Sequence, residues 1–187
     1  MARRGINVRV LYPLSKPIYE LFNRRGLPKS IHFENEKGVD TYYHSYVNWL
    51  PLFGRYKRWH YVSVGLKMFK DYYKTHGNPD LIHVHSALNS GLLAIALKEK
   101  HGIPYVLTEH SSLIAGRKIS AAQHKLINTI YQKSSANIAV SDAFNSTLSD
   151  FFPNTSWTTI PNLVDDTLFS PSPWMSSRSD SDRIQFV

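Results

Sequence analysis

Short apolar segments alternate with longer amphipathic segments along this chain, and the two patterns predict different elements. Brief apolar or alternating runs fit strands, whereas apolar residues three or four positions apart fit one face of a helix. The predicted strands are Asn7–Tyr12, Val39–Tyr46, Leu81–His85, Pro104–Thr108, Asn137–Val140 and Trp157–Ile160. The predicted helices are Trp59–Lys74, a segment around Leu92–Leu97 that ends near Gly102, a segment around Ile119–Tyr131, and one that Ser141 or Asp142 caps and that ends near Phe152.

From Leu81 onward, strands and helices follow one another in the order that is typical of βαβ units and a buried parallel sheet. The expected fold class is therefore α/β, with a Rossmann-like doubly wound parallel sheet. Two regions lack this alternation. The segment Ser15–Lys37 is expected to be loop with short structure, with Pro13 ending the strand before it. Residues 172–182 are typical of a linker because they are rich in Ser, Pro and Asp.

Polar and ionisable residues follow three of the predicted strands. Ligands of open parallel sheets bind beyond the carboxyl ends of the strands, where helix N-termini can also hold an anion. We therefore expect a site built from His83, His85 and Ser86, from Thr108–Ser112, and from Ser141–Asp142. Of the two strand histidines, one is expected to face the opposite side of the sheet and to be structural. The alternative for each position taken alone is an ordinary helix cap or loop residue.

Three imidazoles, from His83, His85 and His110, also allow a metal-dependent hydrolase, since three histidines are a known set of zinc ligands. However, the hydrolase pattern His-x-His-x-Asp-His is absent from the sequence. A Gly-x-Ser-x-Gly elbow, a Gly-x-Gly-x-x-Gly turn and a Walker loop are absent as well, which removes the main signatures of serine hydrolases and of dinucleotide and ATP binding. We expect neither a metal nor another cofactor.

The net charge of +8 favours anionic partners, such as phosphorylated substrates or an anionic membrane surface. The basic, aromatic segment Trp49–His60, together with Lys67, Lys70 and Lys74 on one helical face, fits either membrane docking or a solvated helix face. A non-catalytic, membrane-docking Rossmann-like module is therefore a second alternative. No nucleic-acid-binding module is recognisable. The chain contains no cysteine and no apolar run long enough for a membrane span.

Several segments together resemble glycosyltransferase family four, a large family of retaining enzymes with the two-domain GT-B fold. They occur in the family's order and spacing, over roughly residues 78–171. Leu163 stands where the family usually has glycine, so the neighbouring Asn162 matches less well. The segments are Asn78–His85 (NPDLIHVH), His101–Ser112 (HGIPYVLTEHSS), Ala136–Ser141 (ANIAVS), and Ile160–Asp165 (IPNLVD) with Phe169–Pro171 (FSP).

The resemblance implies a division into residues 1–171, the acceptor-side N-terminal domain, residues 172–182, a linker, and Arg183–Val187, the start of a donor-binding domain that the chain lacks. Ala2–Val10 is similar to the end of the first helix and the second strand of the family, which implies that the family's first strand lies upstream. The alternative is that Asn7–Tyr12 is itself the first strand. In the family order 3-2-1-4-5 strand one is central, so its absence predicts low stability and aggregation.

The resemblance assigns a catalytic role to His110, close to the donor sugar and the forming bond. The substrate-binding residues that it implies are His85, Ser86, Glu109, Ser111, Ser141 and Asn162. The implied reaction transfers a sugar from a nucleotide-sugar donor to a glycan or lipid-linked acceptor, with retention of configuration and without a metal. The donor would bind through the second domain, so the 187-residue chain alone is expected to be inactive. The implied setting is polysaccharide biosynthesis by a cytoplasmic protein, peripheral on the inner face of the membrane.

Overall fold

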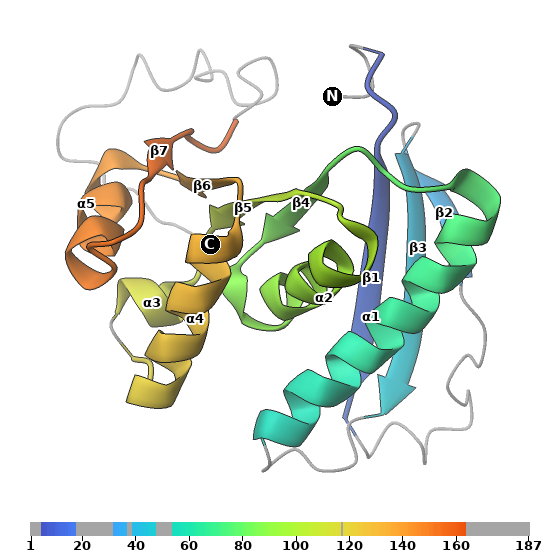
Figure 1. The fold of residues 1–187 in the computed structure, drawn as a ribbon, viewed down its shortest axis with the longest axis horizontal. Coiled ribbons are helices and arrows are strands. Elements are labelled where there is room, and N and C mark those ends of the chain that lie inside the picture. Colours follow the sequence, from blue (N-terminus) through green and yellow to red (C-terminus); the bar gives the residue numbers. More distant parts are fainter. Residues whose placement is uncertain (1–4, 18–31, 37–38, 48–53, 117, 164–187) are drawn as a thin grey trace, which may run out of the picture.

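The computed structural model describes residues 5–17, 32–36, 39–47, 54–116 and 118–163, which form two sheets with helices packed against them (Figure 1). The α/β class predicted from the sequence is confirmed. The strands are β1 (Arg9–Lys16), β2 (His32–Glu36), β3 (Val39–Val47), β4 (Ile82–His85), β5 (Tyr105–Glu109), β6 (Ala136–Ala139) and β7 (Thr158–Thr159). The helices are α1 (Gly54–His76), α2 (Leu92–His101), α3 (Ser112–Ala115), α4 (Ala121–Lys133) and α5 (Asp142–Phe151), with a π-helical turn, η3 (Ala87–Gly91), before α2.

The seven strands are divided between two sheets. The first has the order β1-β3-β2, in which β1 and β3 are parallel and β2 is antiparallel to β3. The second has the order β4-β5-β6-β7, with all strands parallel. Within the described residues, β1 and β4 are therefore edge strands. If β1 corresponds to the second strand of the expected order 3-2-1-4-5, then β1 and β4 are the two strands that flank strand one, and one further parallel strand between them would join the sheets.

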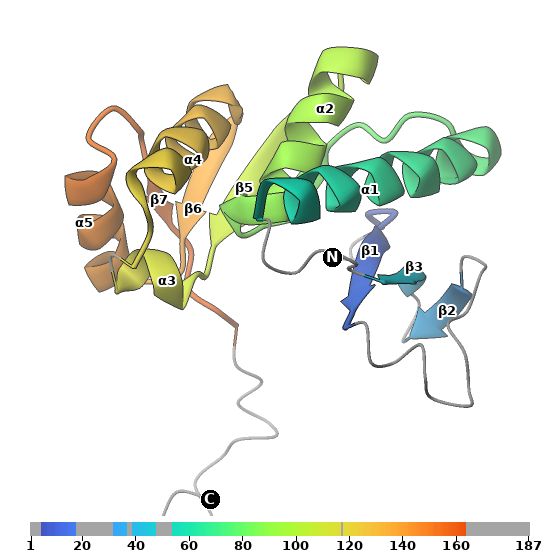
Figure 2. The ribbon, with the colours of Figure 1, turned by 90° about the horizontal axis from the view of Figure 1, so that it is seen from below.

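Helices α1, α2 and α4 lie on one side of the strands (Figure 2). The larger core cluster fills the space between the second sheet and its helices, with Leu107, Ile127 and Ile130 fully buried. A smaller cluster, which includes Phe69 and Leu97, lies between α1 and α2. Leu11 of β1 and Ile82 of β4 both pack against this smaller cluster, so α1 and α2 connect the free edges of the two sheets.

Capping residues define the ends of several helices, two of them at positions predicted from the sequence. Ser141 caps α5, since its Oγ accepts a hydrogen bond from the N–H of Phe144. Gly102 ends α2 in the left-handed conformation, at φ 71°, which glycine adopts without steric cost. Ser120 and Gln123 form a reciprocal capping box at the start of α4. These contacts set where the chain enters and leaves the helices around the second sheet.

One expectation about the N-terminal half is wrong. Pro13 does not end the first strand; it lies inside β1 and pairs with His44. Proline is tolerated in a strand at positions where its missing N–H carries no ladder hydrogen bond. The segment Ser15–Lys37, expected to be loop with short structure, contains the strand β2 of 5 residues, which pairs with β3 as an antiparallel ribbon. The predicted linker 172–182 and the segment Arg183–Val187 lie outside the described residues.

Candidate active site

The expected site lies at the carboxyl ends of β4 and β5, where the two parallel strands end side by side. His85 is the last residue of β4 and pairs with Thr108, and Glu109 is the last residue of β5. The N–H of Ser86 donates to the carbonyl oxygen of Thr108 at 2.8 Å, which extends the pairing by one residue. Because His110 follows Glu109 directly, the two polar segments selected from the sequence meet at one edge of the sheet.

His85 and His110 form a hydrogen-bonded pair across the two strands. Nδ1 of His85 lies 3.1 Å from Nε2 of His110, and the rings are stacked with their centroids 5.2 Å apart. The centroid of the His83 ring lies 4.5 Å from that of His85, and its Nε2 lies 2.8 Å from Oγ1 of Thr108. Partial burial lowers the pKa of His83 and of His85 below the ordinary value, and the neighbouring imidazoles add to the shift. Both rings therefore favour the neutral form.

The expectation that His83 and His85 face opposite sides of the sheet is wrong. Side chains two positions apart along a strand point to the same face, and the two rings are in contact. Val84, between them, points to the other face and is buried in the larger core cluster. Both histidines thus belong to one row of imidazoles that leads to His110.

The carboxylate of Glu109 is fully buried and accepts four hydrogen bonds. Its Oε1 accepts from the backbone N–H groups of His110 and Ser111, at 3.0 and 2.9 Å. Its Oε2 accepts from the backbone N–H of Ala87 at 3.0 Å and from the hydroxyl of Tyr131 at 2.7 Å. Four donors suit a carboxylate, whose burial is tolerated only with such partners. Glu109 therefore ties the loop that carries His110 to the turn after β4.

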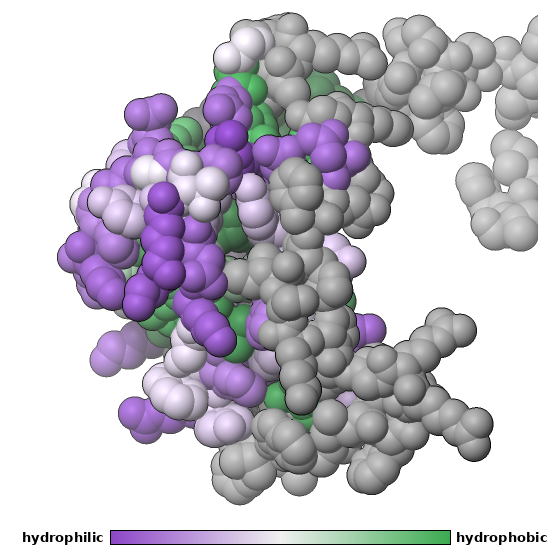
Figure 3. Space-filling view, turned by 90° about the vertical axis from the view of Figure 1, so that its right-hand side faces the viewer, coloured by the Kyte–Doolittle hydropathy of each residue, from purple (hydrophilic) through white to green (hydrophobic). Residues whose placement is uncertain are grey.

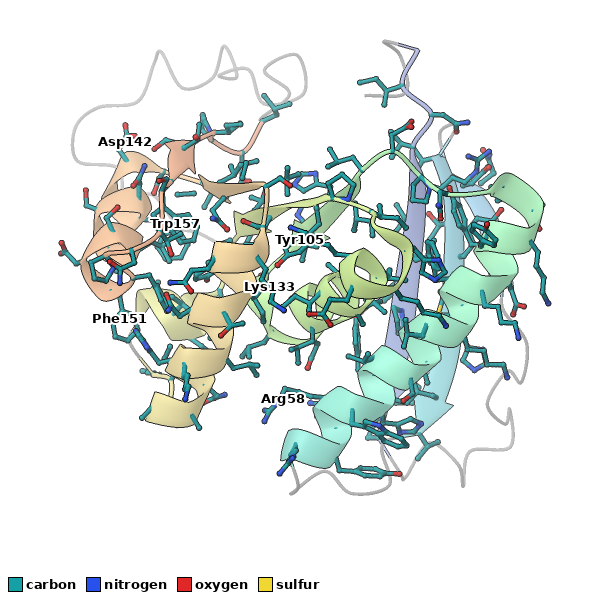
Figure 4. All side chains as sticks on the ribbon, in the orientation of Figure 1. Arg58, Tyr105, Lys133, Asp142, Phe151 and Trp157 are labelled. Atoms are coloured by element: carbon teal, nitrogen blue, oxygen red, sulfur yellow. The ribbon has the colours of Figure 1, made fainter. Side chains whose placement is uncertain are left out.

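Tyr131 of α4 belongs to this arrangement, although the sequence indicated only that it lies on the apolar face of a helix. It is 1% exposed. Burial raises its pKa far above the ordinary value, and the charge of Glu109 and the hydrogen bond to it add to the rise, so the hydroxyl stays a donor. Its ring contacts that of Trp157 edge to face, with centroids 4.7 Å apart, and Figure 4 shows Trp157 between α4 and α5. A tyrosine at a buried helical position needs a partner for its hydroxyl. That requirement is the feature of the sequence from which a role of Tyr131 in the site could have been predicted.

Ser86 begins a strained turn beside the histidine pair. It has φ 66° and ψ 138°, and Asn89 in the same turn has φ 63°. Positive φ at residues other than glycine costs about 1–3 kcal/mol and persists only where packing enforces it. Gly91, the last residue of η3, supplies such packing, because a Cβ there would lie 2.5 Å from Cγ2 of Ile130 in α4. Close contact with α4 therefore holds the turn that presents Ser86.

Ser141 and Asn162 follow the next strands along the same edge. Glu109 pairs with Ala139 at the end of β6, so residues after β6 and β7 lie on the same side as His110. Ser141 uses its Oγ to cap α5, and Asn162 is exposed after β7. In the described ranges the ring of His110 is hydrogen-bonded to His85 rather than to either of them. Their part in ligand binding stays a prediction.

The geometry does not favour the alternative of a metal-dependent hydrolase. One nitrogen each of His85 and His110 is used in their mutual hydrogen bond, and Nε2 of His83 is directed at Thr108. Across the part of the chain that the structure describes, no three His, Cys, Asp or Glu side chains are grouped to hold a metal ion.

Comparison of the sequence with protein families decides the class. The sequence model of Glycosyltransferase Family 4 matches residues 1–168. The chain belongs to Glycosyltransferase Family 4. This membership confirms the resemblance drawn from the segments after residue 78 and extends it to the N-terminal part of the chain. The chain therefore carries a glycosyltransferase domain, and the arrangement at the carboxyl ends of β4 and β5 is its candidate site.

No protein with curated annotation matches this member of Glycosyltransferase Family 4 significantly. Among the helices that the structure describes, none combines the length and the apolar character that crossing a bilayer requires.

Proposed function

We propose that this member of Glycosyltransferase Family 4 transfers a sugar from a nucleotide-sugar donor to a glycan or lipid-linked acceptor, with retention of configuration, and that His110 lies at the reacting centre. The supporting observation is the placement of His110, exposed after β5 on a loop whose backbone N–H groups are held by buried Glu109. An imidazole fixed in this way hydrogen-bonds a sugar hydroxyl without reorganising, which stabilises an oxocarbenium-like transition state.

The other predicted site residues take supporting parts in this proposal. Glu109 shapes the loop and does not contact the ligand, because its carboxylate is buried and fully engaged. Ser111 lies on the same loop, and Ser86, at the head of the turn after β4, faces the acceptor side with His85. Ser141 and Asn162 follow β6 and β7 farther along the same sheet edge and would contribute to ligand binding there.

The proposed division of labour places donor binding in a second domain. Residues 1–171 form the acceptor-side domain, residues 172–182 a linker, and Arg183–Val187 the first strand of the donor-binding domain. Groups of that domain would stabilise the leaving diphosphate electrostatically. The 187-residue chain alone therefore lacks transferase activity in this account.

Helix α1 gives a reason to place the acceptor at an anionic membrane surface. Its first turn has no acidic residue, although the N-terminal end of a helix favours negative charge. Instead, Arg55, Lys57 and Arg58 lie there. A cationic start of this kind costs helix stability and is offset when an anionic surface lies nearby.

The exposed side of α1 is basic along the rest of the helix as well. Trp59 is 63% exposed, and Lys67, Lys70 and Lys74 are exposed on the same face of the helix. We refer to these four residues as the α1 basic face. Figure 3 shows hydrophilic side chains gathered over the flank of the molecule that α1 forms. An exposed indole among lysines suits the interface of an anionic bilayer, so we propose a glycolipid or envelope polysaccharide acceptor on the cytoplasmic face of the membrane.

The experiment that tests the proposed function follows sugar transfer by the full-length protein. The protein is incubated with a panel of labelled nucleotide-sugars and with lipid-linked acceptors extracted from membranes, and the anomeric configuration of the product is read by NMR. The proposal expects one donor to give a product that retains the donor's configuration. A product with inverted configuration, or no transfer from any donor, would contradict it.

A further inference from the structure

We propose that His85 is a positioning residue for His110: its hydrogen bond holds the His110 ring in one orientation and leaves Nδ1, rather than Nε2, to meet the ligand. This inference rests on the proposed function, in which the ring of His110 contacts the donor sugar.

The hydrogen bond itself determines which nitrogen remains. A neutral imidazole carries one N–H and one lone pair, so a bond between two neutral rings needs a donor on one ring and an acceptor on the other. At His110 the nitrogen in the bond is Nε2, which lies 3.1 Å from Nδ1 of His85. The bond couples the tautomers of the two rings without choosing between them, and in either arrangement Nδ1 of His110 is the nitrogen that is left for a sugar hydroxyl.

The His85 ring is itself held in place. It lies on strand β4 between two other rings, with centroids 4.5 Å away at His83 and 5.2 Å away at His110. His83 is anchored by its contact of 2.8 Å with the hydroxyl of Thr108, a residue only 7% exposed. The row of rings therefore runs from a buried anchor to the exposed His110.

His110 has two independent restraints as a result. Glu109 holds its backbone N–H at 3.0 Å, and His85 holds its ring. The first restraint fixes where the loop lies, whereas the second restrains the rotation of the side chain. A catalytic imidazole benefits from a restraint of the second kind, because the orientation of the ring decides which nitrogen faces the ligand.

The surroundings favour the neutral form of His85. Burial lowers the pKa of His85, and the neighbouring His110 contributes. The ionisable neighbours are His83 on β4 and Glu109 on β5, whose carboxylate is turned toward Tyr131 of α4. Neither η3 nor α3 carries an ionisable side chain.

Two substitutions at His85 distinguish the effect of losing the hydrogen bond from the effect of losing the ring. His85→Asn keeps a polar atom near the position of Nδ1 and removes the ring, whereas His85→Phe keeps a ring and removes the hydrogen bond. His83→Phe is the comparison variant: it keeps a ring against His85 and both nitrogens of the bond to His110, and it removes only the contact of His83 with Thr108.

The first measurement is the ¹⁵N signal of the ring nitrogens of His110 in the full-length protein labelled with ¹⁵N-histidine, read from long-range ¹H–¹⁵N correlations of the ring. The inference expects the Nε2 signal of a hydrogen-bonded nitrogen in the wild type, in His85→Asn and in His83→Phe, and a shift of that signal toward the value of a solvent-exposed nitrogen in His85→Phe. An unchanged Nε2 signal of His110 in His85→Phe overturns the inference, whether or not the protein transfers a sugar.

The second measurement is the rate of sugar transfer. His85→Phe is expected to lower kcat roughly 10-fold, the effect of one lost hydrogen bond, with little change in KM for the donor. His85→Asn should restore most of the rate. An inactive wild type whose His110 Nε2 signal responds to His85→Phe would refute the proposed function alone. An active enzyme whose kcat is unaffected by His85→Phe would refute the positioning role.

Discussion

The hydroxyl of Tyr131 donates a hydrogen bond of 2.7 Å to Oε2 of Glu109, and this contact joins helix α4 to the loop that carries His110. Both residues are buried, at 1% and 0% exposure. In a site of low dielectric, a carboxylate loses much of its stabilisation when one donor is removed. The Tyr131–Glu109 contact is therefore expected to matter for stability as well as for the shape of the site.

The first prediction concerns the stability that this contact contributes. Tyr131→Phe removes one of four donors to Glu109 and should lower the free energy of unfolding by about 1–3 kcal/mol. Glu109→Gln places an amide N–H₂ among backbone donors and should cost roughly 2–4 kcal/mol. Urea unfolding followed by circular dichroism measures both. Tyr73→Phe, at a residue 45% exposed, is the control and should change the stability little. Equal stabilities of Tyr131→Phe and Tyr73→Phe would argue against the assigned role.

The second prediction concerns alkaline pH. Burial and the nearby Glu109 raise the pKa of Tyr131, whereas in the unfolded chain a tyrosine ionises near pH 10. The unfolded state therefore loses protons first, so this contribution to stability is complete below about pH 10 and declines as the pH rises further. Burial raises the pKa of Tyr105 as well, so it contributes in the same direction. Urea midpoints from about pH 8 to pH 11 should fall less steeply for Tyr131→Phe than for the wild type; parallel curves would show that Tyr131 is not responsible.

The third prediction concerns the free edges of β1 and β4. Each edge presents backbone groups that the other strands of its sheet do not pair, and such edges promote association. We expect the isolated 187-residue chain to be of low stability and to aggregate in a concentration-dependent way. An N-terminal extension that adds one parallel strand between β1 and β4 should raise the melting temperature and suppress aggregation. A single cooperative melt of the isolated chain at ordinary temperature, independent of concentration, would contradict this account of the N-terminal region.

The fourth prediction concerns the α1 basic face. Replacing Lys67, Lys70 and Lys74 with glutamate should abolish binding of the full-length protein to vesicles that contain anionic lipid. Binding of the wild type should weaken steeply as salt is raised, because the attraction is electrostatic. The matched control replaces Lys100, Lys118 and Lys125, which are also exposed, with the same change in charge. Equal loss of binding in both triple variants would assign the effect to net charge rather than to this face.

The sequence predicted much of the fold because many of its signals are local. Ser141 and Gly102 mark helix ends through their own backbone and side-chain preferences, and the structure confirms both. The short structure expected within Ser15–Lys37 was not placed as strand β2, because the stability of β2 comes from pairing with β3, which a period in the sequence does not report. Pro13 was misinterpreted for a related reason, since its tolerance depends on how β1 pairs with β3.

The candidate site, too, could be predicted from the sequence only where the signals are local. The rule that ligands lie beyond the carboxyl ends of parallel strands correctly brought His85 to His110. The rule could not identify Tyr131 as part of the site. Tyr131 lies 22 positions after Glu109 along the chain, and only the packing of α4 against the second sheet brings the two side chains together. The strained turn at Ser86 was equally inaccessible, since it is enforced by the contact of Gly91 with α4. His83 was assigned to the wrong face because the two-residue period of a strand was misapplied.

The central claim is that His110 acts at the centre of a sugar transfer, and one measurement tests it directly. Transfer from the preferred nucleotide-sugar by the full-length protein is compared between the wild type and His110→Ala, with unchanged circular dichroism as the condition for comparison. The account predicts that kcat falls by roughly 100-fold or more in His110→Ala, while the donor still binds through the second domain. A kcat within about twofold of the wild type, a difference of only about 0.4 kcal/mol in the barrier, would contradict it.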